Sequence, residues 1–245
     1  MNTKPTETAR YHIHHFDEVD STMNVAREMA LAGCPDRTVV VADRQTEGRG
    51  RMDRRWHSAA GGLYFTVVLR PPVQPGEGFK YTFIAAFLLG DLLRSVCGID
   101  ALLKWPNDIL AGGKKLSGML SEMNASADRI HFLNIGIGLN VNNTPSAVEP
   151  NATSINALTG EQFHRQDLLV RFLDAMGGAL YDTMPPAGVM NRWKHYATGL
   201  HSPVRVVTKQ ETIRGVAEDV DNGGKLVVRL EDGRRRRVAV GDCFF

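Results

Sequence analysis

The hydrophobic and polar positions of the chain follow two periods, which predict strands and helices in turn. Short apolar runs are typical of strands, whereas apolar residues every three or four positions indicate helices. We expect strands at 11–16, 38–42, 63–69, 101–104, 109–111, 114–122 and 131–141. We expect helices at 23–32, 79–97, 152–158, 166–181 and 185–197. With a length of 245 residues, this pattern suits one large domain and a small one.

The pattern changes at Gly199-Leu-His-Ser-Pro203, which marks the expected domain boundary. Beyond it, short alternating segments follow at close spacing, at 203–208, 212–220, 225–230 and 234–240. Glycine-containing turns separate the later ones, which predicts a small antiparallel barrel or meander. We therefore divide the chain into a disordered start at 1–10, a main domain at 11–199 and a C-terminal domain at 200–245.

Composition narrows the classes of protein to which the chain can belong. Hydrophobic residues make up 43% of it, and the formal net charge of +2 gives no strong field for nucleic acid or membranes. Its 3 cysteines lack C-x-x-C spacing, so neither a disulfide framework nor a zinc site is indicated. The N-terminus lacks the apolar core of a signal peptide, and the most apolar run, 83–93, is too short to cross a bilayer. We expect a cytoplasmic protein without a membrane partner.

A glycine-punctuated loop at 48–56, the arginine loop, follows the first buried strand. It carries four arginines and ends on a tryptophan: Arg49, Arg51, Arg54, Arg55 and Trp56. Glycine lets the backbone approach a ligand closely, and guanidinium groups present forked donors to phosphate or carboxylate. The loop therefore indicates a site for an anionic, nucleotide-like ligand.

Two hydroxyl residues, Ser21 and Thr22, stand where the helix at 23–32 begins. Such residues commonly cap a helix, and this structural interpretation is the simpler one. The functional alternative is that the hydroxyls and the free amides of the helix start point at a polar ligand atom. The sequence alone leaves both interpretations open.

Three consecutive strand segments carry polar residues that core packing does not require. These residues are Lys104, Asn107, Asp108, Lys115 and Asn140. No P-loop, complete dinucleotide fingerprint, nucleophile elbow or zinc-protease motif accompanies them, which argues against the common hydrolases and P-loop enzymes. The glycines of Gly136-Ile-Gly138 lie inside a strand pattern, and close backbone packing explains them.

Many cationic and amide groups without a nucleophile favour chemistry that needs positioning and charge neutralisation. Transfer at phosphorus, or of an activated acyl group, fits this description. When a carboxylate attacks the α-phosphate of ATP, two anions must approach each other. Arg49, Arg51 and Lys115 would offset the repulsion, and Mg²⁺ is expected to help. Trp56 would stack on adenine.

Motifs that occur in order along the chain resemble those of biotin–protein ligases. They are Gly48-Arg-Gly-Arg51 with Trp56 and Gly61-Gly-Leu-Tyr-Phe65, Lys104-Trp-Pro-Asn-Asp108, Lys115-Leu-Ser-Gly-Met-Leu-Ser-Glu122 and Gly136-Ile-Gly-Leu-Asn140. Asp20-Ser-Thr22 and Ala152-Thr-Ser154 are similar too. The resemblance covers about residues 11–160, and the C-terminal segment is similar to the small SH3-like domain of the family.

The resemblance implies an α+β fold with a mixed, mostly antiparallel sheet and helices, like a class II synthetase, followed by an SH3-like β-barrel. It implies an ATP-dependent ligase that forms biotinyl-5′-AMP from biotin and ATP. A lysine of a biotin carboxyl carrier protein then attacks this anhydride. About ten residues precede the first motif. We therefore expect the short form of the family, without an N-terminal DNA-binding domain, as a monomer or homodimer.

The resemblance also implies roles for individual residues. Biotin would contact Ser21, Thr22, Gln45, Arg49, Gly50, Arg51, Lys115 and Gly118. ATP would contact Arg49, Arg51, Trp56, Asn107, Lys115 and Asn140. The catalytic residues would be Arg51, Lys115 and Asp108, the last as an orienter of the incoming lysine or as its proton acceptor. No metal ligands are assigned.

The chain departs from the family at Asp53, where glycine is usual. Aspartate tolerates a left-handed backbone better than most residues, so we expect function to survive. A lipoate or octanoate ligase or transferase of the same fold is the nearest alternative, although the arginine loop and the Lys104–Asp108 motif favour biotin. A nucleic-acid-binding module built on Arg234–Arg237 is a distant alternative, because arginines along a strand alternate between its two faces.

Overall fold

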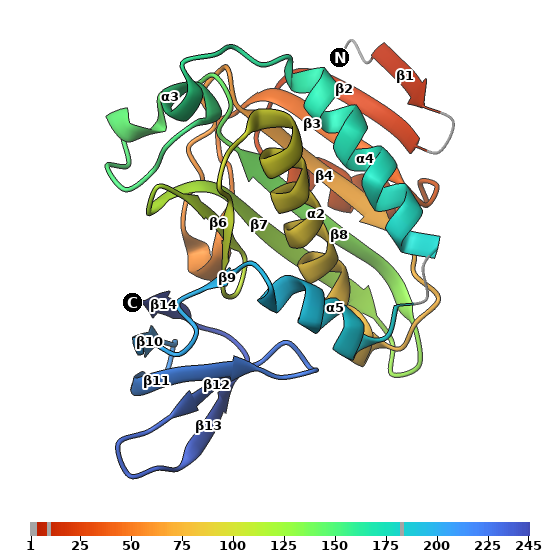
Figure 1. The fold of residues 1–245 in the computed structure, drawn as a ribbon. Coiled ribbons are helices and arrows are strands. Elements are labelled where there is room, and N and C mark those ends of the chain that lie inside the picture. Colours follow the sequence, from red (N-terminus) through yellow and green to blue (C-terminus); the bar gives the residue numbers. More distant parts are fainter. Residues whose placement is uncertain (1–3, 9–10, 182–183) are drawn as a thin grey trace.

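The computed structural model describes residues 4–8, 11–181 and 184–245, which form two sheets and a set of helices (Figure 1). The larger sheet has nine strands, in the order β1 (Lys4–Thr8), β2 (Tyr11–Val19), β3 (Thr38–Gln45), β4 (Leu63–Leu69), β8 (Ile130–Leu139), β7 (Lys114–Ala125), β6 (Asp108–Ala111), β5 (Leu102–Lys104) and β9 (Ala197–Thr198). The pairs β2–β3 and β5–β9 are parallel, and the other neighbours are antiparallel. The expected mixed, mostly antiparallel α+β fold is confirmed.

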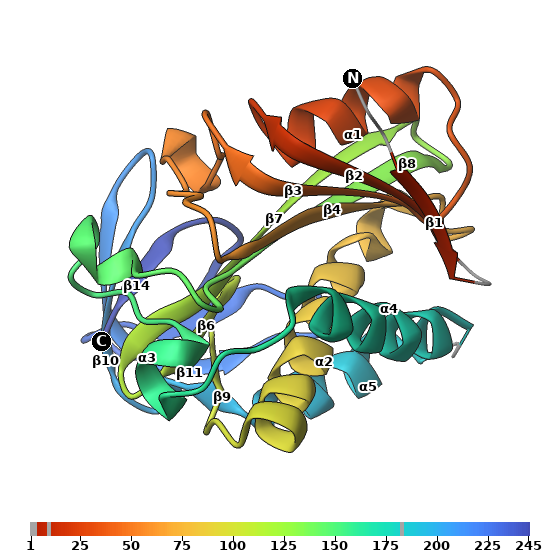
Figure 2. The same ribbon diagram turned by 90° about the horizontal axis from the view of Figure 1, so that it is seen from above.

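Helices cover both faces of the larger sheet. One face carries α1 (Thr22–Leu31), and the other carries α2 (Phe79–Cys97), α4 (Arg165–Tyr181) and α5 (Pro186–Lys194) (Figure 2). All 7 residues of the central strand β4 are buried, because each face of the strand meets a helix layer. Among the described residues, no helix combines the length and apolar character that crossing a membrane requires.

The spacing of apolar residues predicted α2 correctly at both ends. The helix runs from Phe79 to Cys97, and Gly98 follows it with φ of 66°. Glycine is favoured at this position because a Cβ would clash in a left-handed backbone. Phe83 in α2 meets the ring of Trp193 in α5 edge to face at a centroid distance of 5.3 Å, within the main core.

Two strands at the edges of the larger sheet were not expected. Residues 4–8 form β1 along β2, in place of the expected disorder, while residues 1–3 and 9–10 lie outside the described part of the chain. β9 has 2 residues, too few to carry a periodic pattern. Both strands are defined by their pairing with a neighbour and not by a local sequence preference.

The smaller sheet is formed by the C-terminal segment and is antiparallel throughout. Its order is β13 (Arg235–Val238), β12 (Leu226–Arg229), β11 (Thr212–Val220), β10 (Pro203–Val207) and β14 (Asp242–Phe244). No pairing among the described strands joins β13 to β14, so the expected barrel is an open sheet. Polar contacts fix it to the main domain; among them, Trp105 Nε1 donates to the Gly224 carbonyl at 2.9 Å, and Lys194 Nζ lies 2.6 Å from Asp219 Oδ1.

The arginine cluster Arg234–Arg237 at β13 is neutralised within its own domain. Each of the four side chains forms an ion pair with a nearby carboxylate, the partners being Asp232, Glu218, Glu211 and Asp221. A phosphate backbone would have to compete with these carboxylates for every arginine. The pairing therefore disfavours the interpretation of this strand as a nucleic-acid-binding surface.

Candidate active site

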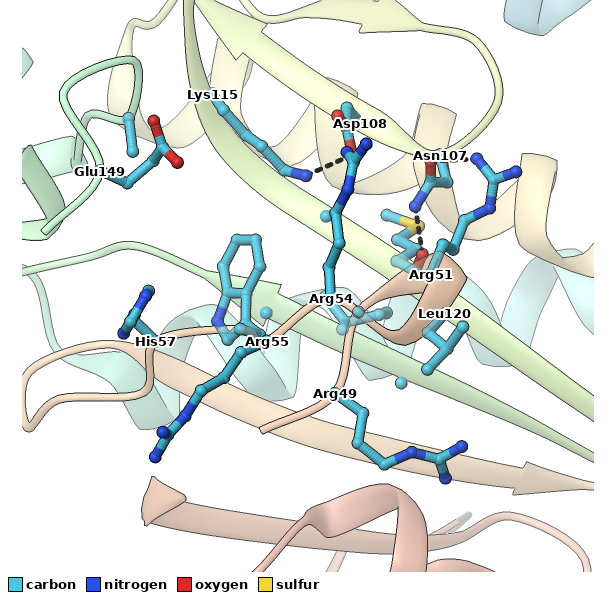
Figure 3. A pocket seen from close by; sticks show the side chains of 18 of the residues that line it. Arg49, Arg51, Arg54, Arg55, His57, Asn107, Asp108, Lys115, Leu120 and Glu149 are labelled. Atoms are coloured by element: carbon cyan, nitrogen blue, oxygen red, sulfur yellow. Dashed lines mark hydrogen bonds and ion pairs between the residues drawn. The ribbon is translucent and has the colours of Figure 1, made fainter. Parts of the chain in front are cut away.

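One pocket brings together the residues that the sequence nominated for the site, except Lys104, which is not among its lining residues. It has a volume of about 300 Å³ and lies between the start of α1, the arginine loop, strands β6 to β8 and the segment 145–152. The nominated residues that line it are Ser21, Thr22, Gln45, Arg49, Gly50, Arg51, Trp56, Asn107, Asp108, Lys115, Gly118 and Asn140. Figure 3 shows Lys115 and Asp108 pointing toward each other across from the loop.

At one end of the pocket, the start of α1 is bonded to the end of β3. Gln45 Oε1 accepts hydrogen bonds from the Thr22 backbone amide at 2.8 Å and from the Thr22 hydroxyl at 3.1 Å. Gln45 Nε2 donates to Ser58 Oγ at 2.7 Å. Ser21 is the N-cap of α1, yet its side chain makes no capping hydrogen bond, and its buried Oγ has no partner among the described residues. Capping therefore does not explain Ser21, whereas a ligand would satisfy its hydroxyl.

Arg51 ties the loop to two other parts of the molecule. Its Nη1 donates to Asn107 Oδ1 at 3.1 Å, and its Nη2 donates to the Gly241 carbonyl of the C-terminal domain at 3.3 Å. Asn107 in turn donates to the Met119 carbonyl at 2.5 Å. Burial lowers the pKa of Arg51, and the nearby carboxylate of Asp242 opposes this shift. A guanidinium held away from water in this way acts strongly on an anion in the pocket.

The indole of Trp56 lies against the backbone of two paired glycines. Gly118 and Gly138 are partners in the β7–β8 ladder. A Cβ on Gly138 would lie 2.4 Å from Trp56 Cε2, and one on Gly118 would lie 3.1 Å from Trp56 Cζ3. Lys115 Nζ is 5.4 Å from the indole centroid, within range of a cation–π contact. The close packing expected at Gly138 is confirmed, and the group that packs there is the indole.

Lys115 and Asp108 form an ion pair at the centre of the pocket. The distance from Lys115 Nζ to Asp108 Oδ1 is 2.8 Å, with side chains 35% and 21% exposed. The contact is not aligned as a hydrogen bond. The backbone of Lys115 is fixed on both sides, because its amide donates to the Asn151 carbonyl and its carbonyl accepts from the Thr153 amide. A firmly held backbone with an accessible ammonium group suits a residue that binds an anion.

Two family models match the chain over most of its length. The Biotin/lipoate A/B protein ligase family matches residues 15–142, and the Biotin protein ligase C terminal domain matches residues 200–245. The Bifunctional ligase/repressor BirA of Bacillus subtilis is 35% identical over 238 residues, which cover 94% of this chain and 73% of that protein. The chain belongs to the biotin protein ligase family. The Biotin--[acetyl-CoA-carboxylase] ligase of Paracoccus denitrificans is also 35% identical, over 92% of this chain and 97% of that protein.

The solved structures agree with this assignment of the ligase. A biotin protein ligase from Aquifex aeolicus, solved in complex with biotin and ATP, superposes with a TM-score of 0.78 at 27% identity. The match covers 95% of this chain and 97% of that chain, so both sheets and the helices between them are included.

Two residues of the arginine loop, Arg49 and Arg55, point away from Lys115 and Asp108 (Figure 3). Arg49 Nη2 lies 2.7 Å from Glu122 Oε1. Arg55 donates to the carbonyl of Thr46. The stem of Arg49 lines the pocket, but its charged end is committed to a carboxylate outside it. Direct contact of the Arg49 guanidinium with biotin or ATP therefore needs this pair to break.

The pocket of the ligase also contains residues that were assigned no individual contact, two of which, Arg54 and Arg55, belong to the loop at 48–56. They are Met23, Arg54, Arg55, His57, Met119, Leu120, Gly136, Ile137, Gly138, Pro145, Val148, Glu149, Asn151, Ala152 and Asp242. Ala152 opens one of the motifs quoted above, so that motif could have indicated it. Asp242 pairs with Arg54 across the two domains, and no motif near the C-terminus indicates this contact. Glu149 has no cationic partner among the residues that the structure describes.

Asp53, where the family usually has glycine, lies in a strained turn of the arginine loop. Met52 and Asp53 have φ of 54° and 61°, in the left-handed region. The Asp53 side chain is 94% exposed, and its one ion-pair distance among the described residues is 3.7 Å, to Lys209 Nζ. Asp53 thus adopts the left-handed backbone that aspartate tolerates better than most residues, and the survival of function stays a prediction.

Replacing Asp53 with glycine should stabilise the protein. Glycine carries no Cβ penalty at positive φ, so we expect the free energy of unfolding to rise by about 1 kcal/mol in chemical denaturation. Asp53→Ala is the matched control and should lower it, because alanine pays the strain without the local hydrogen bonding of aspartate. Equal stability of the three proteins would contradict the strain at this turn.

Replacing Gly138 with alanine should displace Trp56 and weaken ATP binding. The new Cβ would overlap the indole, and a stacking contact with a base is worth ~1–3 kcal/mol, so we expect about tenfold weaker binding in calorimetry. Gly178→Ala is the control, because Gly178 lies in the exposed part of α4 with no atom near the added Cβ. Unchanged ATP affinity in Gly138→Ala would show that the indole has no part in nucleotide binding.

Proposed function

We propose that this ligase joins biotin to ATP as biotinyl-5′-AMP and then passes the biotinyl group to a lysine of a biotin carboxyl carrier protein. The observation that carries the proposal is the single pocket in which hydroxyl and amide groups at one end adjoin cationic groups at the other. The names of the relatives support it, because the Paracoccus denitrificans protein is a biotin–[acetyl-CoA-carboxylase] ligase and the Aquifex aeolicus structure contains biotin and ATP.

The uncharged end of the pocket suits the ureido ring of biotin. That ring offers a carbonyl oxygen and two N–H groups, which match hydroxyl donors and amide acceptors. The Ser21 hydroxyl at this end of the pocket is buried and lacks a hydrogen-bond partner among the described residues, so it would gain one from the ligand. Thr22 and Gln45 are already bonded to each other, and this fixes the positions of their polar atoms before biotin arrives.

In the first step, an oxygen of the biotin carboxylate attacks the α-phosphorus of ATP, and pyrophosphate leaves. Lys115 and Arg51 would offset the repulsion between these two anions. Lys115 is held by Asp108 before the substrates bind, so its ammonium group is shared between Asp108 and the incoming anions. Trp56 would support the adenine, and Asn107 would hold Arg51 in place through their hydrogen bond.

In the second step, the amine of the carrier lysine attacks the carbonyl carbon of the anhydride, and AMP leaves. The attacking nitrogen must lose a proton as the amide forms. Asp108 is the carboxylate beside Lys115 and is the candidate to orient the amine or to take this proton. The arginine loop would cover the anhydride and shield it from water until the carrier docks.

Magnesium fits this site as part of the Mg·ATP substrate. The described residues contain no group of three or more acidic, histidine or cysteine side chains placed to hold a metal ion. Mg²⁺ commonly keeps several waters and binds through substrate phosphates with one or two carboxylates, which needs no protein cage. Glu149, the pocket carboxylate without a described cationic partner, is the residue best suited to assist. When bound, the ion would neutralise phosphate charge.

The cytoplasmic location, the monomeric or homodimeric state and the absence of a DNA partner remain predictions from the sequence. The reaction proposed for the pocket depends on none of these three predictions.

Exchange of labelled pyrophosphate into ATP tests the first step and the choice of acid together. We expect exchange with biotin and none with lipoate or octanoate at the same concentration. Exchange with lipoate or octanoate, and none with biotin, would show that the substrate is one of those acids and not biotin. Exchange with no acid would contradict an acyl-adenylate mechanism.

A further inference from the structure

Glu122 ends the Lys115–Glu122 motif, yet the proposed reaction gives it no role. It lies on β7, outside the set of residues that line the pocket. Each of its carboxylate oxygens meets a different arginine: Oε1 is 2.7 Å from Arg49 Nη2, and Oε2 is 2.5 Å from Arg27 Nη2. Arg27 Nε also donates to Oε2 at 3.2 Å. The carboxylate is 23% exposed, so it is partly withdrawn from water.

The two arginines come from two different elements of the site. Arg27 lies on α1, the helix whose first residues form the uncharged end of the pocket. Arg49 lies in the arginine loop, and its Nη1 also donates to Asn24 Oδ1 on the same helix at 3.2 Å. Glu122 itself is on the strand that carries Lys115. One carboxylate thus joins the loop, the helix and the catalytic strand.

We propose that Glu122 is a positioning residue that latches the arginine loop through Arg49 and so slows the escape of the bound adenylate. The proposal rests on the proposed function in that the retained species is biotinyl-5′-AMP. Glu122 touches neither substrate in this scheme. It acts by fixing where the loop leaves β3, close to Gly50 and Arg51.

A latch must be able to open, and Arg27 lowers the free-energy cost of opening. Breaking an ion pair is costly when it leaves a withdrawn charge without a partner. When Arg49 swings away, Arg27 still neutralises the Glu122 carboxylate. The far end of the loop is held separately, by Arg51 at the Gly241 carbonyl and by Arg54 at Asp242, both in the C-terminal domain. Glu122 is therefore a charged side-chain anchor of the near end, in addition to the backbone hydrogen bonds of Thr46 and Glu47.

Glu122→Gln keeps the shape of the side chain, but it removes the negative charge and replaces one acceptor oxygen with an NH2 group, which cannot accept a hydrogen bond from an arginine. We expect biotinyl-5′-AMP to leave the purified complex about fivefold faster, the scale of one partly exposed ion pair. We also expect trypsin to cleave the ligand-free protein within the arginine loop about fivefold faster. Glu28→Gln is the matched control, because Glu28 lies exposed on α1 outside the pocket. It should behave as the parent protein.

The double variant Arg49→Gln/Glu122→Gln separates a latch from a general structural role. If Glu122 acts through Arg49, its replacement adds nothing to the release rate once Arg49 is glutamine. Additive effects, or equal release from Glu122→Gln and Glu28→Gln, would overturn the proposal. The trypsin measurement needs no ligand, so failure of the parent protein to form the adenylate would count against the proposed function and leave the test of the latch intact.

Discussion

Lys115→Ala should form biotinyl-5′-AMP about a hundredfold more slowly than the parent protein, because removal of one preorganised charged donor from a site of this kind costs about 10²–10³ in rate. Lys115 is the ammonium group at the centre of the pocket, 2.8 Å from Asp108. Its loss removes a positive charge from the place where two anions meet and leaves the Asp108 carboxylate to repel them. Single-turnover formation of labelled adenylate measures the effect.

Lys114→Ala is the control for this result. Lys114 precedes Lys115 on β7 and is exposed outside the pocket, so it has the same charge without the same position. We expect its rate to match that of the parent protein. Full activity of Lys115→Ala would place the carboxylate and phosphate contacts on another residue.

Arg51→Ala should release biotinyl-5′-AMP about tenfold to a hundredfold faster. Hydrogen bonds that involve a charged group are worth ~1.5–3 kcal/mol, which corresponds to this range of rates. Arg51 makes two such contacts, to Asn107 and to the Gly241 carbonyl, and it is half-buried beside the pocket. Without it, the loop loses its connection to the C-terminal domain at this point. The free adenylate should then label lysines of a bystander protein.

Retention of labelled adenylate on a desalting column, with biotinylation of serum albumin as a second readout, measures this loss. Arg44→Ala is the control, since Arg44 is an exposed arginine on β3 outside the pocket. Equal retention by Arg51→Ala and Arg44→Ala would contradict the assignment of the loop as the cover of the site.

Local patterns predicted those elements whose ends are set by their own residues. The helix α2 ends where Gly98 adopts a left-handed backbone, and a glycine directly after the last apolar position of the helix predicts this end. The strands β1, β9 and β14 depend on a neighbour that completes their hydrogen bonds, so their short segments carry no independent pattern. Strand spacing predicted a small antiparallel barrel or meander, and the sheet is open with β10 to β13 paired in sequence, because closure depends on packing that spacing does not show.

The nominated site residues each belong to a short motif with a chemical reason, and they lie around one pocket, while their individual roles remain predictions. The orientation of their side chains could not be predicted in the same way. Arg49 and Arg51 are two residues apart, yet one turns to Glu122 on β7 and the other to Asn107 and the C-terminal domain. These partners are distant in the sequence and are fixed only by the packing of the sheet and the two domains.

Asp242 illustrates the same limit for residues that no motif marks. It reaches the pocket because β14 pairs with β10, and this places it beside Arg54. Glu149 lines the pocket because the segment 149–153 is bonded to the backbone of Lys115. No sequence motif distinguishes either of these carboxylates from an ordinary surface carboxylate.

Activation of biotin in this pocket and its transfer to a carrier lysine can be observed in one reaction. Intact-mass spectrometry of a biotin carboxyl carrier domain, incubated with this protein, biotin and Mg·ATP, tests it most directly. We expect the addition of one biotinyl group to one lysine, dependent on both biotin and ATP. An unmodified carrier, or one modified equally well without ATP, would contradict it.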